Sequence, residues 1–231
     1  APDMSLVTAT DSCGPIIITH LGDSGNGGAG CAASPLVVTR TYRVADGSGN
    51  VVDRNQLFTV IDVTPPSITS FPANQSLSCP GQIPPANVGS VSALDGCGGT
   101  VLITHVGDVS NGGAGCTDSP LIVTRTYRAS DSCGNAVTQS QTFTVVDVTA
   151  PTIQQFPADQ SLQCESEIPA ADIGAVIAVD DCDPAVIVTH VGDVTNGGSG
   201  CSDSPLIVTR TYRATDACGH TVEQTQHFTI I

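Results

Sequence analysis

The sequence predicts an all-β fold of tandem sandwich repeats, and three observations lead to that prediction. A long segment recurs almost unchanged from Gly22, Gly107 and Gly192, so the chain repeats with a period of about 85 residues. Short runs of alternating apolar and polar residues occur throughout, separated by Gly, Pro, Asn and Asp. No segment carries an apolar stripe of helical period. About seven short strands in about 85 residues are typical of an immunoglobulin-like unit.

Residues 121–129, LIVTRTYRA, show the strand alternation most clearly. Their odd-numbered residues, including Arg125 and Tyr127, share one face, and the even-numbered residues share the other. Residues 141–147, QTFTVVD, alternate in the same way, with Phe143 on the apolar face. We therefore expect antiparallel strands that bury one face each.

The repeats are expected to meet just after Asp62 and Asp147, where the motif Asp-Val-Thr is followed by proline. Because these joints are short and contain proline, they are stiff, which predicts an end-to-end rod of repeats. The first repeat lacks the counterpart of SITSFPANQSLSCP, so the chain reads as a window from a longer array. The open sheet edge left there invites pairing, and we expect preceding residues of the parent chain to fill it. A strand from another chain is the alternative, which is disfavoured because this chain has no spare strand at its C-terminus to donate. The expected units are residues 1–62 (an N-terminally truncated repeat), 63–147 and 148–231.

The composition excludes several classes of partner. The chain has 22 acidic residues and 7 basic ones, with a net charge of −15, which disfavours nucleic acid and anionic lipid. We find no signal-peptide pattern and no apolar run long enough to span a membrane. Aromatic residues make up only 3% of the chain and Trp is absent, so the cores are lean and covalent staples would help them.

Ten cysteines supply such staples, and the pairing follows from which of them the first repeat keeps. That repeat retains Cys13 and Cys31, and it has Ser48 where a later repeat has Cys133. The inner pair is kept together and the outer pair is lost together, which predicts bonds within each repeat and no odd thiol. A loop of about 20 residues would contribute roughly 3 kcal/mol. The expected pairs are Cys13–Cys31, Cys97–Cys116, Cys182–Cys201, Cys79–Cys133 and Cys164–Cys218.

Zinc is the alternative use of these cysteines and of the recurring histidines. Structural zinc sites usually contain a C-x-x-C pair, and this chain has none. Disulfides are therefore favoured, and they imply an oxidising, extracellular setting.

A glycine-rich stretch, GNGGAG at residues 25–30, fits the G-x-G-x-x-G spacing of dinucleotide-binding loops. The residues that follow favour a turn and a strand, whereas a binding loop is followed by a helix. In the later copies Gly25 is replaced by Ser110 and Thr195, so the spacing occurs once only. We interpret the stretch as a flexible turn that ends in a cysteine.

Aspartates recur at the repeat spacing, in the joints and in the turns after the long strands. Calcium binds six to eight oxygen ligands, largely from loops, so a joint aspartate and a loop aspartate of the neighbouring repeat could share one ion. The alternative is that these aspartates cap their own turns, and no D-x-D-x-D-G loop is present. No other cofactor is expected. The calcium candidates are Asp46, Asp62, Asp131, Asp147 and Asp216, and further aspartates recur at Asp23, Asp108, Asp193, Asp95, Asp180, Asp181 and Asp183.

Two other side chains recur in every repeat. Histidine ends a strand in the motif Thr-His-x-Gly-Asp, and its presence in each copy favours a structural hydrogen bond over catalysis. Arginine shares a strand face with tyrosine, which predicts an inward guanidinium held by a carboxylate or carbonyl. The alternative is an outward face that contacts sugar or protein. The residues are His20, His105 and His190, and Arg40, Arg125 and Arg210.

Four motifs occur together in this chain, namely TRTYRATDACG (209–219), DVTPP (62–66), LSCP (77–80) and LDGC (94–97). Together they resemble the HYR-like, immunoglobulin-like repeats of long cell-surface adhesins from gliding and related bacteria. The resemblance covers essentially the whole chain and implies secretion, tandem display on a bacterial surface, and adhesion or filament building without enzymatic activity. Ser48 and His220 depart from the family pattern, which has Cys and Asn there.

The sequence thus predicts a non-enzymatic, extracellular stalk or filament protein with a structural and adhesive role at the cell surface. Its expected partners are further repeats of the parent chain, other copies in lateral or end-to-end fibres, and surface glycans or proteins. The alternative is a carbohydrate- or protein-binding module that acts through the loops rich in Gly, Asn and Asp.

Overall fold

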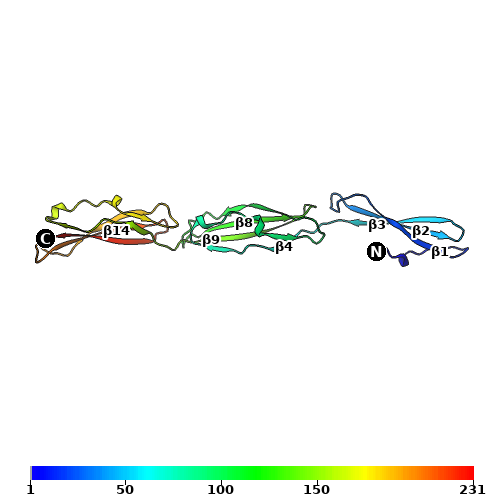
Figure 1. Cartoon of the computed structure of the whole chain (residues 1–231), viewed down its shortest axis with the longest axis horizontal. Coiled ribbons are helices and arrows are strands. Elements are labelled where there is room, and N and C mark those ends of the chain that lie inside the picture. The colour runs from blue at the N-terminus through cyan, green and yellow to red at the C-terminus, as the bar shows by residue number, and fades with distance from the viewer. Residues whose placement is uncertain (1) are drawn as a thin grey trace. The chain divides into compact units, whose positions relative to one another are not determined.

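The structure, a computed structural model, describes residues 2–231 and is all-β over that range. Its helical elements there are 3-10 turns of three residues (Figure 1). No helix in this part of the chain has the length and apolarity that a bilayer crossing needs. The fold class expected from the sequence, a disulfide-stapled all-β chain, is confirmed.

The elements follow the sequence period. The first repeat contains η1 (Met4–Leu6), β1 (Ile16–Gly25), β2 (Leu36–Asp46) and β3 (Val51–Val60). The second contains β4 (Ser67–Ser70), β5 (Gln75–Leu77), η2 (Pro80–Gln82), η3 (Val88–Ser90), β6 (Ser92–Leu94), β7 (Leu102–Ser110), β8 (Leu121–Ser130) and β9 (Ala136–Val145). The third contains β10 (Thr152–Gln155), β11 (Gln160–Leu162), η4 (Glu165–Glu167), η5 (Ile173–Ala175), β12 (Ile177–Val179), β13 (Ile187–Thr195), β14 (Leu206–Thr215) and β15 (Thr221–Ile230).

Each of the two later repeats has a four-stranded sheet, ordered β5-β9-β8-β7 and β11-β15-β14-β13, and a two-stranded sheet, β4-β6 and β10-β12. The long strands are antiparallel neighbours, whereas the short edge strands β5 and β11 run parallel to β9 and β15. The first repeat has only the three-stranded sheet β1-β2-β3. Its strand β3 therefore has one edge without a partner strand.

By spatial proximity the chain divides into two compact units. One consists of Ala1–Pro72, Asn87–Val106 and Tyr127–Gln139, and the other of Ala73–Ala86, Gly107–Thr126 and Ser140–Ile231. This division cuts through the middle sequence repeat. The boundaries after Asp62 and Asp147 therefore stay a prediction.

The alternating strands bury the face that the sequence marked as apolar. Phe143 and Val145 of β9 are fully buried, and so is Phe228 of β15. Around Phe228, Val208 and Ile230 form a small core, against which Leu162, Ile168 and Leu206 pack. Burying one such side chain stabilises the folded state by roughly 1.5–3 kcal/mol. Because each core contains few large side chains, its stability depends on further constraints such as disulfides.

The recurring Thr-His-x-Gly motif marks a β-bulge. The register of β1 against β2 shifts between His20 and Gly22, and that of β13 against β14 shifts between His190 and Gly192. The φ angles of Gly22 and Gly192 are +146° and +157°, values that other residues rarely adopt. The glycine is therefore required by the bulge.

A buried tyrosine ties the short η turns to the long strands. The Tyr127 hydroxyl accepts a hydrogen bond from the backbone N–H of Asn87 at 3.1 Å, and Tyr212 accepts one from Asp172 at 3.2 Å. Phe71 and Phe156 pack edge-on against these tyrosines, with ring centroids 5.9 and 5.8 Å apart.

Replacing Tyr212 with Phe should lower the free energy of unfolding by about 1 kcal/mol, because the part-buried hydrogen bond from the N–H of Asp172 is lost while the packing remains. Thermal or chemical unfolding followed by circular dichroism measures the change. An unchanged unfolding midpoint would show that water satisfies this N–H equally well.

Candidate functional site

Residues 2–231, which the structure describes, contain three disulfides, and each one links neighbouring sequence repeats. Their Cα atoms lie 4.8–5.2 Å apart, within the usual range for a disulfide. The sequence separations are 102, 103 and 102 residues, longer than one repeat. The bonded pairs are Cys31–Cys133, Cys79–Cys182 and Cys116–Cys218.

The pairing predicted within repeats is wrong, and strand length explains why. Cys13 and Cys31 flank β1, whose ten residues span roughly 33 Å. A disulfide cannot join Cα atoms more than about 7 Å apart. The same argument separates Cys97 from Cys116 across β7, and it separates the third predicted inner pair across β13, namely Cys182–Cys201.

The predicted outer pairs fail for the same reason. β11 runs parallel to β15, with Leu162 opposite Ile230, so Cys164 lies near the end of β15. Cys218 lies in the turn before β15 begins, about ten residues away along that strand. The equivalent predicted pair, Cys79–Cys133, follows the same repeat pattern, and both cysteines bond elsewhere.

Four thiols stay free in the described residues, contrary to the expectation of none. All four are exposed. Two of them are counterparts of Cys182, which bonds to the preceding repeat, and the other two are counterparts of Cys79 and Cys116, which bond to the following repeat. They are Cys13, Cys97, Cys164 and Cys201.

At each joint, a backbone hydrogen bond links the joint aspartate to the glycine-rich turn that contains the cysteine. The N–H of Asp62 donates to the carbonyl of Gly30 at 2.6 Å, and that of Asp147 donates to Gly115 at 2.6 Å. Cys31 forms a parallel bridge with Asp62, and Cys116 forms one with Asp147. The turn cysteine and the start of the next repeat are therefore held side by side, which brings the next repeat's cysteine within bonding distance.

The loop aspartates among the calcium candidates cap their own turns. Asp46 accepts hydrogen bonds from the backbone of Ser48 and Asn50 and from the Asn50 side chain. Asp131 is bound in the same way by Cys133 and Asn135. These contacts match the turn-capping alternative.

Asp216 is the third loop aspartate, and its turn contains His220 in place of asparagine. The backbone N–H of His220 donates to Asp216 at 2.8 Å, and the imidazole Nδ1 lies 2.8 Å from the other carboxylate oxygen. Burial by itself raises the pKa of Asp216, but the hydrogen bonds from His220 outweigh it and leave that pKa below its usual value. Asp216 is therefore a buried anion at neutral pH.

The joint aspartates lie among further ligand-type groups. Oxygen or nitrogen atoms of Asp147, Asp216 and His220 lie within 4.8 Å of one another, and both aspartates are at most 5% exposed. Asp180 lies beside Asp147 in a second such group, and its Oδ2 atom is buried without a hydrogen-bond partner.

The other joint repeats this arrangement. Asp95 lies beside Asp62, and its Oδ2 atom is likewise buried without a partner. Hydrogen bonds from the backbone and hydroxyl of Thr64 lower the pKa of Asp62, so this carboxylate is also ionised at neutral pH.

Arg125 and Arg210 lie inward and form bidentate ion pairs, and the less buried Arg40 pairs with Asp23 in the same way. Arg210 is 5% exposed, and its guanidinium donates to Asp193 and to the carbonyl of Pro169. It lies 5.0 Å from the Phe228 ring centroid, a cation–π contact. Arg125 binds Asp108 and Pro84 in the same way.

The aspartates of these pairs also bind the recurring histidines. His20 Nε2 lies 2.8 Å from Asp23, and His190 Nε2 lies 2.8 Å from Asp193. The hydrogen bond from Arg210, ahead of that from His190, lowers the pKa of Asp193 against the effect of burial. Each histidine also packs against the neighbouring tyrosine ring, as His190 does at 5.8 Å. The triad of His, Asp and Arg is thus a structural brace.

The glycine-rich turns are closed by their own side chains. Asn111 accepts hydrogen bonds from the N–H groups of Gly113 and Ile122 and donates to the carbonyl of Pro120. A Cβ on Gly113 would lie 2.0 Å from that carbonyl oxygen, so only glycine fits. The glycines therefore serve the turn, and no dinucleotide-binding strand–turn–helix follows them.

No family model matches this chain, and no curated protein matches it. Among solved structures, the protocadherin gammaB4 extracellular domain is similar, with 13% identity, a TM-score of 0.31, and coverage of 94% of this chain and 45% of that one. This chain thus spans less than half of that protein's length.

Two further structures are similar at the same level. Extracellular cadherin domains 3–6 of protocadherin gamma B2 share 13% identity with a TM-score of 0.28, over 94% of this chain and 68% of that chain. The human desmocollin-1 ectodomain shares 12% identity with a TM-score of 0.26, over 83% and 46%.

Non-reducing peptide mapping should recover the three bonds between repeats. Replacing Cys116 and Cys218 together with Ser should lower the free energy of unfolding by about 4.7 kcal/mol, because the bond closes a loop of about 100 residues. The control Cys13→Ser, at an exposed free thiol, should change it by less than about 0.5 kcal/mol. A peptide linking Cys97 to Cys116 would contradict the structure.

Proposed function

We propose that this chain is part of a non-enzymatic, extracellular stalk or filament protein that bears load at a cell surface. The observation that carries the proposal is that every disulfide bridges a joint between neighbouring sequence repeats. Such bonds do little for the core of one repeat, but they prevent repeats from being pulled apart. This use of cysteine suits a molecule whose task is mechanical.

The staggered bonds create a short covalent route through the chain. It runs from the N-terminus to Cys31, across to Cys133, back to Cys116, across to Cys218 and on to the C-terminus. Only about 60 residues lie along that route, which at ~3.5 Å per residue extend to roughly 200 Å. The reduced chain of 231 residues would extend to roughly 800 Å.

The proposed location follows from the same chemistry. Disulfides persist in oxidising compartments, and the net charge of −15 favours solubility outside the cell. The resemblance to HYR-like repeats of surface adhesins supports display on a bacterial surface, adhesion, and lateral or end-to-end assembly of copies. The alternative role in glycan or protein binding through the loops has no specific support, since the Asn side chains there bind their own turns.

Single-molecule pulling tests the mechanical proposal. The chain stretched by its ends should lengthen to about a quarter of its contour length when oxidised and to all of it after reduction. The double variant Cys116→Ser, Cys218→Ser removes one of the two bonds on the short route and should give an intermediate length. Full extension of the oxidised chain at moderate force would contradict the proposal.

We also propose that calcium binds at the joints. Asp147 and Asp216 are nearly fully buried, and the neighbouring Asp180 offers a buried oxygen without a hydrogen-bond partner. Buried anions that lie close together need a compensating cation, and carboxylate oxygens from loops are ligands that calcium prefers. The repetition of an orphan oxygen at Asp95, beside Asp62, supports the same role at the other joint.

Calcium titration of the chain, by calorimetry and thermal unfolding, tests this site. Calcium at 100 times its dissociation constant should stabilise the chain by about 2.7 kcal/mol. Asp180→Asn should weaken the effect because it removes a charged ligand, whereas the control Asp203→Asn, in an exposed loop, should not. Equal unfolding midpoints with calcium and with a chelator would exclude the site.

A further inference from the structure

The second joint contains a histidine at the position where the first joint has an asparagine. At the first joint, the side-chain nitrogen of Asn135 lies 2.9 Å from Asp131 Oδ2 and 3.5 Å from the carbonyl oxygen of Asp62. At the second joint, the counterpart His220 places its Nδ1 atom 2.8 Å from Asp216 Oδ2. The same position therefore carries an amide at one joint and an imidazole at the other.

The imidazole completes a set of three metal-ligating side chains. Ligand atoms of Asp147, Asp216 and His220 all lie within 4.8 Å of one another. Asp147 and Asp216 are 4% and 5% exposed, whereas the side chain of His220 is 29% exposed. The two carboxylates are therefore the buried part of the set, and the ring forms its solvent side.

A disulfide holds these three ligands together. Cys218 stands between Asp216 and His220 in the same turn, and it bonds Cys116. Cys116 in turn forms a parallel bridge with Asp147. Covalent and backbone bonds thus fix the ligands before an ion arrives, which lowers the entropic cost of binding.

Hydrogen bonds orient both carboxylates of the set. Asp147 Oδ1 accepts one from the N–H of Thr149 at 2.9 Å and one from its hydroxyl at 2.7 Å. Asp216 Oδ1 accepts one from the N–H of His220 at 2.8 Å. Metal ligands in proteins are held in position by outer hydrogen bonds of this kind.

A buried oxygen without a partner lies beside the set and points to a missing ligand. Asp180 Oδ2 is buried and has no hydrogen-bond partner among the described residues, and a ligand atom of Asp180 lies within 4.8 Å of one of Asp147. A cavity of about 210 Å³ opens beside Asp147 and Cys218. It gives room for an ion with a water, whose hydrogen the oxygen of Asp180 can accept. Buried negative charge of this density requires a cation.

The nitrogen ligand decides which cation fits this set best. Calcium takes six to eight ligands, which are oxygen atoms. An imidazole nitrogen suits zinc and its neighbouring transition metals, and three protein ligands with a water in the fourth position form a common zinc geometry. At the first joint, Asn135 offers at most a further oxygen. The two joints therefore differ in the ion that they favour.

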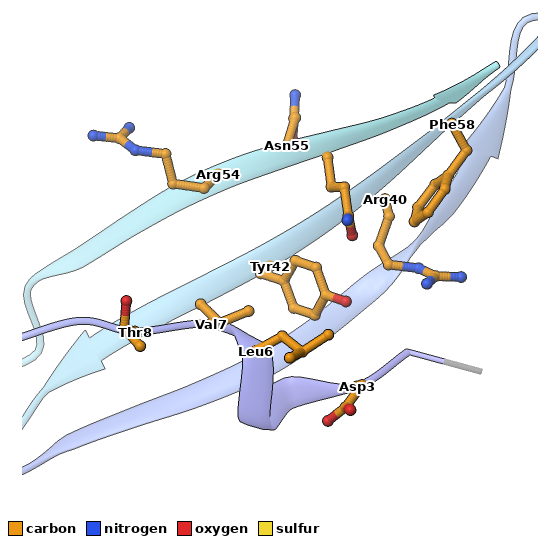
Figure 2. Close-up of a pocket in the computed structure, with 10 residues that line it drawn as sticks. Asp3, Leu6, Val7, Thr8, Arg40, Tyr42, Arg54, Asn55 and Phe58 are labelled. Carbon is orange, nitrogen blue, oxygen red and sulfur yellow. The ribbon is translucent and has the colours of Figure 1, made fainter.

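The cavity on the sheet of the first repeat has the opposite electrostatic character. Figure 2 shows Arg40 and Arg54 on the strands that border it and Asp3 on the adjacent turn. Two guanidinium groups with one carboxylate disfavour a cation. In the later repeats Phe71 and Phe156 pack against the corresponding tyrosine, so in those copies the repeat itself fills this place.

We propose that the second joint binds one zinc ion through Asp147, Asp216 and His220, with a water in the fourth position that donates to Asp180. Because Asp216 is ionised, Nδ1 of His220 carries the hydrogen when no ion is bound. Zinc takes the place of that hydrogen and Nε2 takes up the proton, so the ring stays neutral.

The ion would tie the second repeat to the third, since Asp147 ends one and the other two ligands belong to the next. This inference rests on the proposed use of the joint aspartates as cation ligands. Zinc and calcium share Asp147 and Asp216, so zinc excludes calcium from the second joint and leaves the first joint to it.

Zinc titration of the chain by calorimetry tests this site. The chain carries Cys13→Ser, Cys97→Ser, Cys164→Ser and Cys201→Ser, because exposed thiolates bind zinc themselves. We expect one zinc ion per chain and a raised midpoint of thermal unfolding. Cobalt as a coloured substitute should show the visible absorption of a tetrahedral site. Calcium in about tenfold excess should not displace the zinc.

Matched variants take their residues from the second repeat, so the fold should be retained. His220→Asn recreates the turn of the first joint and should weaken zinc binding by about 100-fold or more, because even outer partners of a metal ligand contribute about 10–100-fold. The control His227→Thr removes another imidazole of the third repeat, which contacts Thr209 and has Thr142 as its counterpart. It should leave the zinc affinity unchanged. In the reverse direction, Asn135→His should create a second zinc site at the first joint.

Two results would overturn the inference. One is an equal zinc affinity with and without His220→Asn, which would mark the bound zinc as adventitious. The other is displacement of zinc by calcium at equal concentration, which would show that the carboxylates alone select the ion. Calcium titration of the His220→Asn chain tests the calcium proposal separately. Calcium binding without zinc binding would leave the proposed function standing, and zinc binding without calcium binding would leave this inference standing.

Discussion

The length of the long strands is the constraint on which the rest of this molecule depends. A strand of ten residues carries its two ends roughly 33 Å apart, far beyond the reach of a disulfide. Cysteines placed in the turns at opposite ends of one repeat cannot meet, and they bond instead with the turns of the neighbouring repeat. The covalent network therefore lies at the joints, where sandwich repeats in series are held mainly by short linkers.

Charged groups inside a repeat are arranged differently from charged groups at a joint. Within a repeat, buried Arg210 is neutralised by Asp193 and rests on Phe228, so the lean core gains a rigid brace without an unpaired charge. At a joint, by contrast, Asp147, Asp216 and Asp180 gather negative charge and leave one oxygen without a partner. The buried charges of the core are therefore paired, whereas the joint carries the negative charge on which the calcium proposal rests.

Much of the fold was readable from the chain itself. The alternation in residues 121–129 predicted the buried face of β8, and Phe143 lies buried as its place in the period-two pattern requires. The disulfides were not readable from which cysteines are kept or lost together, because that pattern is shared by pairs within a repeat and by pairs between repeats. The strand-like run between Cys97 and Cys116 was the available signal, since it separates the two sulfurs.

The sequence by itself determined the period, the strands, the inward arginine and the glycine turns, because each depends on residues close together in the chain. Only the tertiary structure decided which sulfurs bond, which aspartates gather at a joint, and which sheet remains uncovered. Those features arise from the parallel placement of short edge strands and from the ends of long strands, and they join residues about 30 to 100 positions apart. No local pattern encodes such distances, so the geometry of the folded repeats sets them.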